Sequence, residues 1–298
     1  MKDFIPLGIK DKILFQKYLQ KIDAESYEYS FHSLYLWRSF SNVKYSILDD
    51  ILVVEKREQD KGTYFMEPIG YKDEDLPALI YKLRHIQKLR KNDLLFGDIE
   101  QKFIDKIKNI DCDHVKIIED INHFEYVYST KELIDLKGHK YSNKKNHCSN
   151  FAKLYDYELT EINNEKIIDD CINLLDKWQQ RKGLYSKEII EEIAVIKDIL
   201  FKLELLNLKS MAVYVKDNMA GFSIGGYIKN NAGVIHIEKG DTNFKGIYQF
   251  LNREFLKKDF STTDIINRQE DCGIEGLKIA KTSYHPIKMV KKFLISTV

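Results

Sequence analysis

The sequence has little proline, little cysteine and almost no net charge. With only four prolines in 298 residues, long disordered or fibrous stretches are not expected. The 47 basic and 46 acidic side chains leave a formal charge of +1. No overall field therefore attracts a nucleic acid or an anionic membrane, and any such partner has to be bound by a local patch.

The cysteines and the apolar runs exclude further classes of protein. Cys112, Cys148, Cys171 and Cys272 are far apart and form no CxxC pair, so we interpret them as reduced and mostly structural, and we predict no metal site. No apolar run approaches the roughly 18 residues of a membrane span. The first residues lack the apolar core of a signal peptide. We therefore expect a cytoplasmic protein without a membrane span.

What the sequence does have is enough apolar side chain for two folded domains. Its composition, 44% apolar and 31% charged, is typical of a globular protein, and its length fits two domains of roughly 150 residues each. Periodicity predicts one order of elements twice: two helices, three strands, a helix, a strand and a helix, with hairpins turning at 49–50 and 217–218. We predict an α/β protein with mixed (α+β) sheets and domains at 1–125 and 126–298.

The stretch INRQEDCGIEGLKIAKTSYHP begins at the end of a predicted strand and gathers charge there. Its candidate substrate-binding residues are Asn267, Arg268, Glu270, Asp271, Lys278 and Lys281. In an open α/β sheet, the C-terminal end of a strand delivers side chains into the ligand crevice. Arg268 is suited to clamp a carboxylate or phosphate, and Glu270 or Asp271 to hold an ammonium. The alternative is an internal salt bridge between Arg268 and one of these two carboxylates.

A second candidate site lies in the stretch HIEKGD. His236 and Glu238 are two residues apart on a predicted strand, so we expect them to point to one face and share a site. Glu238 is the candidate general base, and His236 and Asp241 are candidate substrate-binding residues. A surface His–Glu pair on an exposed strand face is the alternative. We expect Glu238 to line one concave surface with the charged residues of 268–281.

Two local patches are basic. Residues 131–153 hold six lysines and two carboxylates, and five lysines but no carboxylate follow Glu275. Lys140, Lys144 and Lys145 are the predicted contacts to a nucleic acid or phosphate, because lysines with interleaved aromatic side chains suit an RNA acceptor stem. A solvated helix start explains Lys144 and Lys145 nearly as well.

A family resemblance rests on three stretches: LKGHKYSNKKNHCSNFAKLYDYELTEI, VIHIEKGDTNFKGIYQFLNREF and INRQEDCGIEGLKIAKTSYHP. They resemble a bacterial family (DUF2156) that is similar to the C-terminal domain of phosphatidylglycerol lysyltransferases. That family looks like a tandem of two GNAT (Gcn5-related N-acetyltransferase) folds, as do the Fem aminoacyltransferases, which move amino acids from tRNA to cell-wall precursors. The resemblance implies an acyl or aminoacyl transferase with aminoacyl-tRNA or acyl-CoA as donor and a small amine or hydroxyl compound as acceptor.

The resemblance also implies catalytic roles for Glu238 and Tyr284. In many GNAT folds a carboxylate on the strand that carries Glu238 takes the proton of the attacking amine, and a tyrosine placed like Tyr284 protonates the leaving group. The other interpretation of Tyr284 is an aromatic plug beside Pro286.

The resemblance leaves the donor open. Many GNAT-like chains bind the pyrophosphate of acyl-CoA at a glycine-rich turn before a helix. Here Gly240 and Gly246 are not closely spaced, and Asp241 would repel a phosphate. This favours an aminoacyl donor over acyl-CoA. The rival functions are a CoA-dependent N-acetyltransferase and a non-catalytic binding module that kept the fold.

Overall fold

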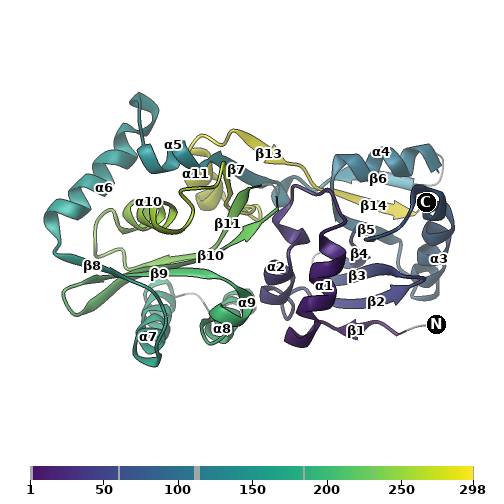
Figure 1. Ribbon diagram of the computed structural model, residues 1–298, viewed down its shortest axis with the longest axis horizontal. Coiled ribbons are helices and arrows are strands. Elements are labelled where there is room, and N and C mark those ends of the chain that lie inside the picture. The colour runs from purple at the N-terminus through teal and green to yellow at the C-terminus, as the bar shows by residue number, and fades with distance from the viewer. Residues whose placement is uncertain (1–2, 60, 111–114, 184, 230, 298) are drawn as a thin grey trace. The chain divides into compact units, whose positions relative to one another are not determined.

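The computed structural model describes residues 3–59, 61–110, 115–183, 185–229 and 231–297. The chain divides into two compact units, Met1–Phe124 with Val290–Val298, and Glu125–Met289 (Figure 1). The division near residue 125 lies where the sequence suggests a domain boundary. The expected second domain, 126–298, differs from the observed unit at its end, because the last residues of the chain join the first unit.

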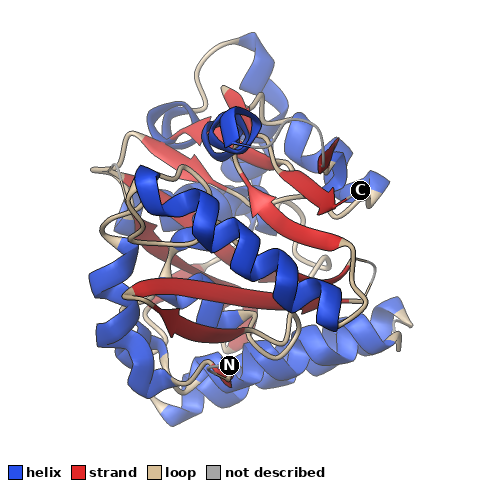
Figure 2. Ribbon diagram, turned by 90° about the vertical axis from the view of Figure 1, so that its right-hand side faces the viewer, coloured by secondary structure: helices blue, strands red, loops and turns tan. Residues whose placement is uncertain are grey.

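The first unit contains a seven-stranded mixed sheet with the order β1-β2-β3-β4-β5-β14-β6. Its strands are β1 (Ile5–Pro6), β2 (Lys44–Leu48), β3 (Ile51–Glu58), β4 (Gly62–Phe65), β5 (Leu94–Ile99), β6 (Val115–Glu119) and β14 (Phe293–Thr297), and its helices are α1 (Lys12–Leu19), α2 (Phe31–Leu36), α3 (Leu76–Leu89) and α4 (Gln101–Ile110). In Figure 2 this unit faces the viewer, and helices lie against its sheet. Leu83 of α3 and Phe103 of α4 are fully buried in the core, since both helices are amphipathic.

The second unit contains a seven-stranded mixed sheet with the order β13-β7-β12-β11-β10-β9-β8. Its strands are β7 (Glu125–Ser129), β8 (Tyr157–Thr160), β9 (Lys209–Val215), β10 (Asn218–Ile228), β11 (Ala232–Gly240), β12 (Ile265–Asn267) and β13 (Lys288–Val290), and its helices are α5 (Thr130–Asp135), α6 (Ser142–Leu154), α7 (Glu165–Lys182), α8 (Lys187–Leu200), α9 (Leu203–Leu206), α10 (Ile247–Asp259) and α11 (Glu275–Thr282). Phe250 and Phe255 of α10 pack with Met211 and Val213 of β9 in one apolar core.

The two sheets have the same strand order once one of them is reversed. Strands β1, β2, β3, β4, β5, β14 and β6 correspond to β8, β9, β10, β11, β12, β7 and β13, and the parallel pair is β4–β5 in one sheet and β11–β12 in the other. The sixth strand of each sheet is a segment that directly follows a strand of the other sheet. The chain leaves β6 to place β7 in the second sheet, and it leaves β13 to place β14 in the first. This exchange explains why the last residues belong to the first unit.

The hairpin turns follow local chemistry. Asp49 and Asp50 both have positive φ (50° and 63°), which the two-residue turn between β2 and β3 requires, so the predicted turn at 49–50 is confirmed. In the second unit the turn falls at Lys216 and Asp217, one residue earlier than predicted, because β10 already begins at Asn218.

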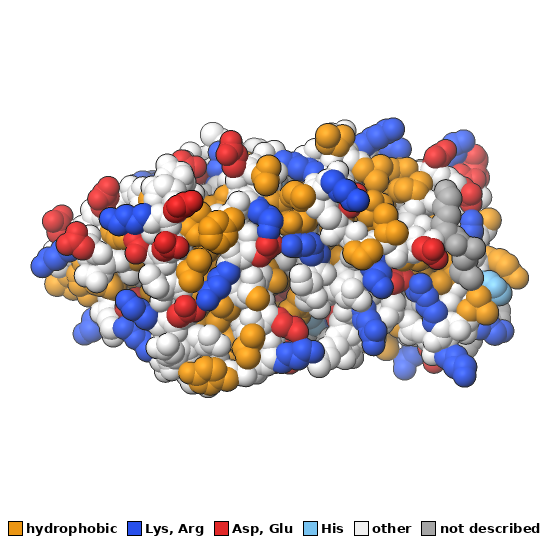
Figure 3. Space-filling model, turned by 90° about the horizontal axis from the view of Figure 1, so that it is seen from below, with side chains coloured by type: hydrophobic (Ala, Val, Ile, Leu, Met, Phe, Trp, Pro, Cys, Tyr) orange, Lys and Arg blue, Asp and Glu red, His pale blue; other side chains and the backbone are white. Residues whose placement is uncertain are grey.

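The surface and the helices carry two further findings. On the face shown in Figure 3, acidic and basic side chains are interspersed without a large area of one sign, as the near-zero net charge suggests. Within the described ranges, no helix is both long and apolar enough to cross a bilayer.

Candidate functional site

Strands β11 and β12 separate soon after they meet. They pair in parallel only from Ala232 with Ile265 to Val234 with Asn267. Strand β12 then ends, whereas β11 continues to Gly240. The segment after β12, residues 268–274, therefore begins beside the C-terminal half of β11, where an open α/β sheet places its ligands.

Arg268 and Glu238 form an ion pair across this gap. Arg268 Nη2 donates to Glu238 Oε2 at 2.5 Å, and the two side chains are 15% and 12% exposed. Asn252 of α10 donates to the other carboxylate oxygen at 2.9 Å. Burial alone would lower the pKa of Arg268, but Glu238 and two nearby tyrosines raise it above its ordinary value, so the guanidinium stays charged. The alternative interpretation pairs Arg268 with Glu270 or Asp271, whereas the structure pairs Arg268 with Glu238.

Aromatic rings surround the guanidinium. The Arg268 guanidinium carbon lies 4.8 Å from the ring centroid of Tyr284 and 5.9 Å from that of Tyr128. Burial raises the pKa of Tyr284, so its phenol keeps its proton at neutral pH. Arg268 Nη1 is buried and has no hydrogen-bond partner among the described residues. The site therefore offers a phenol and an unused N–H donor beside the carboxylate.

His236 occupies a β-bulge in β11. Ile237 pairs with Ile224 and Ile235 with Gly225, so His236 is the extra residue and the strict alternation assumed from the sequence does not hold. His236 is nevertheless joined to the site, because Gln269 Nε2 donates to its Nδ1 at 2.8 Å. His236 and Glu238 thus contact consecutive residues of one turn.

Two of the predicted ligand residues hold that turn from within. Asn267 donates to Glu125 at 2.5 Å and accepts from the backbone N–H of Gln269 at 2.8 Å. Asp271 accepts from the hydroxyl of Tyr126 at 2.6 Å and from the backbone N–H two residues further on. Both side chains are buried and shape the turn around Arg268.

The remaining residues of the charged segment lie in different surroundings. Lys281 Nζ donates to the backbone carbonyls of Arg268 and Glu270. The Glu270 side chain is half-buried, and Lys278 is exposed on α11. The structure therefore joins Arg268 directly to Glu238, while Lys281 bonds to the main chain of the turn and Lys278 lies in solvent.

The turn before α10 is bonded internally. Asp241 pairs with Arg181 of α7 and accepts from the N–H of Asn243 at 2.9 Å, beside a cavity of about 30 Å³. The N–H of Lys245 donates to the Tyr155 hydroxyl at 3.2 Å. A side chain at Gly246 would begin only 2.5 Å from the backbone oxygen of His147 on α6. A pyrophosphate at this helix terminus would compete with a carboxylate and with these bonds.

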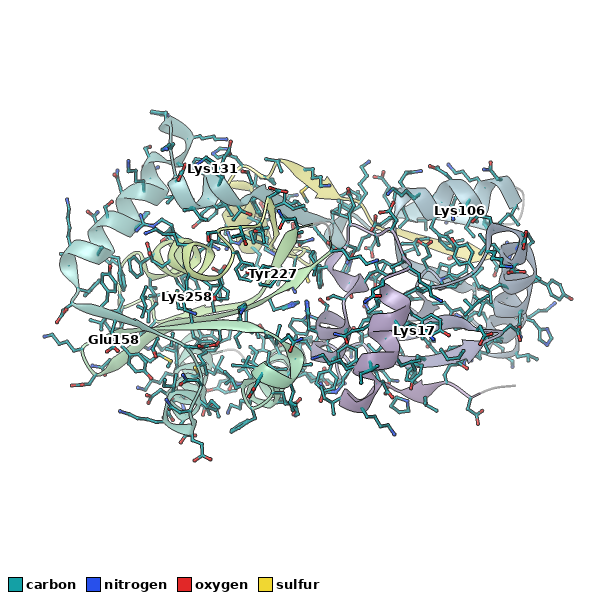
Figure 4. The ribbon with its side chains drawn as sticks, in the orientation of Figure 1. Lys17, Lys106, Lys131, Glu158, Tyr227 and Lys258 are labelled. Carbon is teal, nitrogen blue, oxygen red and sulfur yellow. The ribbon has the colours of Figure 1, made fainter. Side chains whose placement is uncertain are left out.

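The three lysines predicted to contact a nucleic acid or phosphate lie in different surroundings. Lys140 pairs with Glu132 at 2.8 Å, and Lys144 donates to Ser283 Oγ at 2.7 Å, with its Nζ 4.3 Å from the Tyr284 ring centroid. Burial and the charge of Arg268 lower the pKa of Lys144. Lys145 is exposed. Lys131 on α5 (Figure 4) is paired with Asp135, so part of the basic patch is neutralised within its own segment.

The described residues hold no cluster of three metal-ligating side chains from His, Cys, Asp and Glu. Cys148 and Cys171 are buried free thiols, and burial raises the pKa of both. Cys272 is an exposed thiol, and Cys112 lies outside the described residues.

Sequence reasoning missed Asn252, Gln269 and Tyr128, which complete the surroundings of Glu238, His236 and Arg268. Each comes from a different element, and none has a distinctive spacing from its partner in the sequence.

Two mixed sheets of this order define the class of protein: two GNAT-like acyltransferase folds in tandem, as predicted. A solved tandem GNAT protein from the clavulanic acid biosynthesis pathway has the same fold, with a TM-score of 0.54 over 99% of this chain and 98% of its own, at 8% identity.

The chain belongs to the family described as phosphatidylglycerol lysyltransferase, C-terminal, which matches residues 19–296. It is similar to a conserved protein of unknown function from Bacteroides thetaiotaomicron, with 27% identity, complete coverage of both chains and a TM-score of 0.90. It is also similar to L-PGS from Bacillus licheniformis, with 12% identity, a TM-score of 0.65 and coverage of 98% of this chain and 92% of that one. The expected family is therefore confirmed, and family and fold relate the chain to aminoacyl and acyl transferases.

Proposed function

We propose that the chain is an aminoacyltransferase that moves an aminoacyl group from aminoacyl-tRNA to a small amine or hydroxyl acceptor. The observation that carries this proposal is the buried Arg268–Glu238 pair beside Tyr284, at the point where β11 and β12 separate. Isolated charges are costly to bury, so a paired charge with an unused donor at an open strand end is better explained by a ligand than by stability.

The turn before α10 supports an aminoacyl donor over acyl-CoA. A helix terminus binds pyrophosphate through free N–H groups and the helix dipole. Here Asp241 lies in the turn, N–H groups are already bonded, and Gly246 packs against the backbone of α6. Helix α6, by contrast, contains no acidic residue and exposes Lys145 and Lys153, which suits an RNA phosphate backbone.

The reaction requires a base, a donor that stabilises the oxyanion and an acid, and three residues of the site can supply them. The acceptor nitrogen or oxygen attacks the acyl carbon of the aminoacyl ester, and Glu238 receives the acceptor's proton, since each carboxylate oxygen has a second lone pair. The unused Arg268 Nη1–H stabilises the negative charge that develops on the carbonyl oxygen. The ester C–O bond then breaks, and the Tyr284 phenol gives its proton to the ribose oxygen that leaves.

A donor comparison tests the proposal. The purified chain is incubated with radiolabelled aminoacyl-tRNA or with radiolabelled acetyl-CoA, each with a panel of amine and hydroxyl acceptors, and transferred label is counted. We expect transfer from aminoacyl-tRNA alone. Arg268→Lys, which keeps the charge but loses the forked donor, should lower the rate by roughly 100-fold. The matched change Arg253→Lys, at an Arg–Glu pair on α10, should leave the rate unchanged.

Other outcomes would point to the rival functions. Transfer from acetyl-CoA would support a CoA-dependent acetyltransferase and contradict the proposed donor. A folded chain that binds charged tRNA or an acceptor but transfers from neither donor would support a non-catalytic binding module.

A further inference from the structure

The side chain of Lys281, on α11, is hydrogen-bonded to the main chain of the turn that carries Arg268. Its Nζ donates to the carbonyl oxygen of Arg268 at 2.7 Å and to the carbonyl oxygen of Glu270. Lysine has three N–H donors and usually directs them to water or to a carboxylate. Here two of the three N–H donors bond to the carbonyl oxygens of the residues on either side of Gln269. Such bonds fix the backbone of a loop.

The turn requires such a constraint. Gln269 and Cys272 have φ values of 60° and 52°, in the left-handed region that is unfavourable for residues other than glycine. On the side of β7, the Arg268 N–H donates to the Tyr126 carbonyl at 2.9 Å, and the Tyr126 N–H donates to the Gln269 carbonyl at 3.1 Å. Peptide groups of the turn are thus held by β7 and by Lys281.

We propose that Lys281 is a positioning residue, which holds the turn so that the Arg268 side chain reaches Glu238. The proposal rests on the proposed function in so far as Arg268 belongs to a transferase site. It replaces the expectation that Lys281 binds substrate. The same lysine links α11 to the turn that carries Arg268.

The strength of the hydrogen bonds from Lys281 to the turn depends on pH. The charged and titratable groups that face Lys281 are Arg268, Glu270, Asp271 and Cys272 of the turn and Tyr126 of β7. Burial lowers the pKa of Lys281 to about 8; Arg268 also lowers it, whereas Glu270, Cys272 and Asp271 raise it. Burial raises the pKa of Tyr126, which stays neutral in this range. Above pH 8 the ammonium becomes an amine, and its bonds to the carbonyls lose their charge-assisted strength.

Carbonyl NMR tests the positioning role without a substrate. The chain is labelled with [1-¹³C]arginine, and the Arg268 carbonyl resonance is assigned by its loss in Arg268→Lys. A Cys272→Ser background removes the exposed thiol of the turn, because unperturbed thiols have a pKa of about 8.5 and could overlap the lysine transition. We expect the Arg268 carbonyl shift to titrate with a midpoint near pH 8 in this background and to lose that transition in Lys281→Met.

Two further variants serve as controls for the carbonyl titration. Lys281→Arg retains a charged donor at every pH tested, so the carbonyl should keep its low-pH shift without a transition. Lys258→Met removes another lysine that bonds to a backbone carbonyl, that of Ser210 at 3.3 Å (Figure 4), and should leave the titration intact. A transition that persists in Lys281→Met, or no transition between pH 6.5 and 10 in the background chain, would overturn the proposal.

Activity separates this proposal from the proposed function. If transfer is detected, Lys281→Met should lower its rate at pH 7 to roughly the rate of the background chain at high pH, where the turn is released. An unchanged rate with a lost titration would contradict the positioning role. An intact titration in a chain that transfers nothing would contradict only the proposed function.

Discussion

Glu67 in the first unit should make the chain less stable as the pH rises. Burial, with a smaller contribution from Glu100, raises the pKa of Glu67 from 4.5 to about 7, although a hydrogen bond from the Tyr71 hydroxyl at 2.9 Å favours the charged form. Replacing Glu67 with glutamine keeps a carbonyl oxygen that accepts the same hydrogen bond and removes the charge. The perturbation therefore isolates the cost of burying this carboxylate in its ionised form.

The magnitude and its sign follow from linkage. A carboxyl whose pKa is higher in the folded than in the unfolded chain contributes stability that is fully present below pH 4.5 and is lost as the pH rises through about 7. The difference between 4.5 and about 7 corresponds to about 3 kcal/mol, of which roughly 2 to 3 kcal/mol is lost between pH 5 and 8.5. Glu67→Gln lacks this loss, so the variant should gain that much relative to the parent chain.

Urea unfolding at pH 5, 6, 7 and 8.5 measures the effect. The difference in free energy of unfolding between Glu67→Gln and the parent chain should shift in favour of the variant across this range. Glu74→Gln is the matched control, because Glu74 lies in the same unit and is 75% exposed, and its difference should stay nearly constant. A constant difference for Glu67→Gln would show that this carboxyl titrates as in water, and the reasoning would be wrong.

Two further changes test buried ion pairs. Lys292→Met removes a fully buried cation next to Glu28 and should lower the free energy of unfolding by about 3–5 kcal/mol, whereas the exposed neighbour change Lys291→Met should cost about 0–1 kcal/mol in the same urea titration. Arg268→Ala leaves Glu238 buried without its cation and should likewise cost about 3–5 kcal/mol by urea unfolding; a loss below 1 kcal/mol would mean that the pair is solvated.

The element order could be predicted because each signal is local. Helix α3, Leu76–Leu89, follows from apolar residues at helical spacing, and the β2–β3 turn predicted at 49–50 consists of two aspartates with positive φ. The strand exchange could not be predicted, because alternation within β7 marks a strand without stating which sheet it joins. Strands β6, β13 and β14 also escaped prediction.

The residues of the candidate site could be named but not assembled from the sequence. Arg268 is named because it follows a strand, and Glu238 because it lies on another. Their direct pairing depends on where β12 stops beside β11, which a sequence interval of 30 residues does not encode. The acceptors of Lys281 are backbone carbonyls, which are present in every residue and therefore leave no trace in the composition.

The most direct test of the proposed function is mass spectrometry of the acceptor after reaction with aminoacyl-tRNA. Phosphatidylglycerol vesicles and small amines are offered separately, each with uncharged tRNA as the control. We predict that one acceptor gains the mass of the aminoacyl residue, that charged tRNA is required, and that Arg268→Lys slows the gain by roughly 100-fold. A product formed equally well by Arg268→Lys, or one that carries an acetyl group from acetyl-CoA instead, would contradict it.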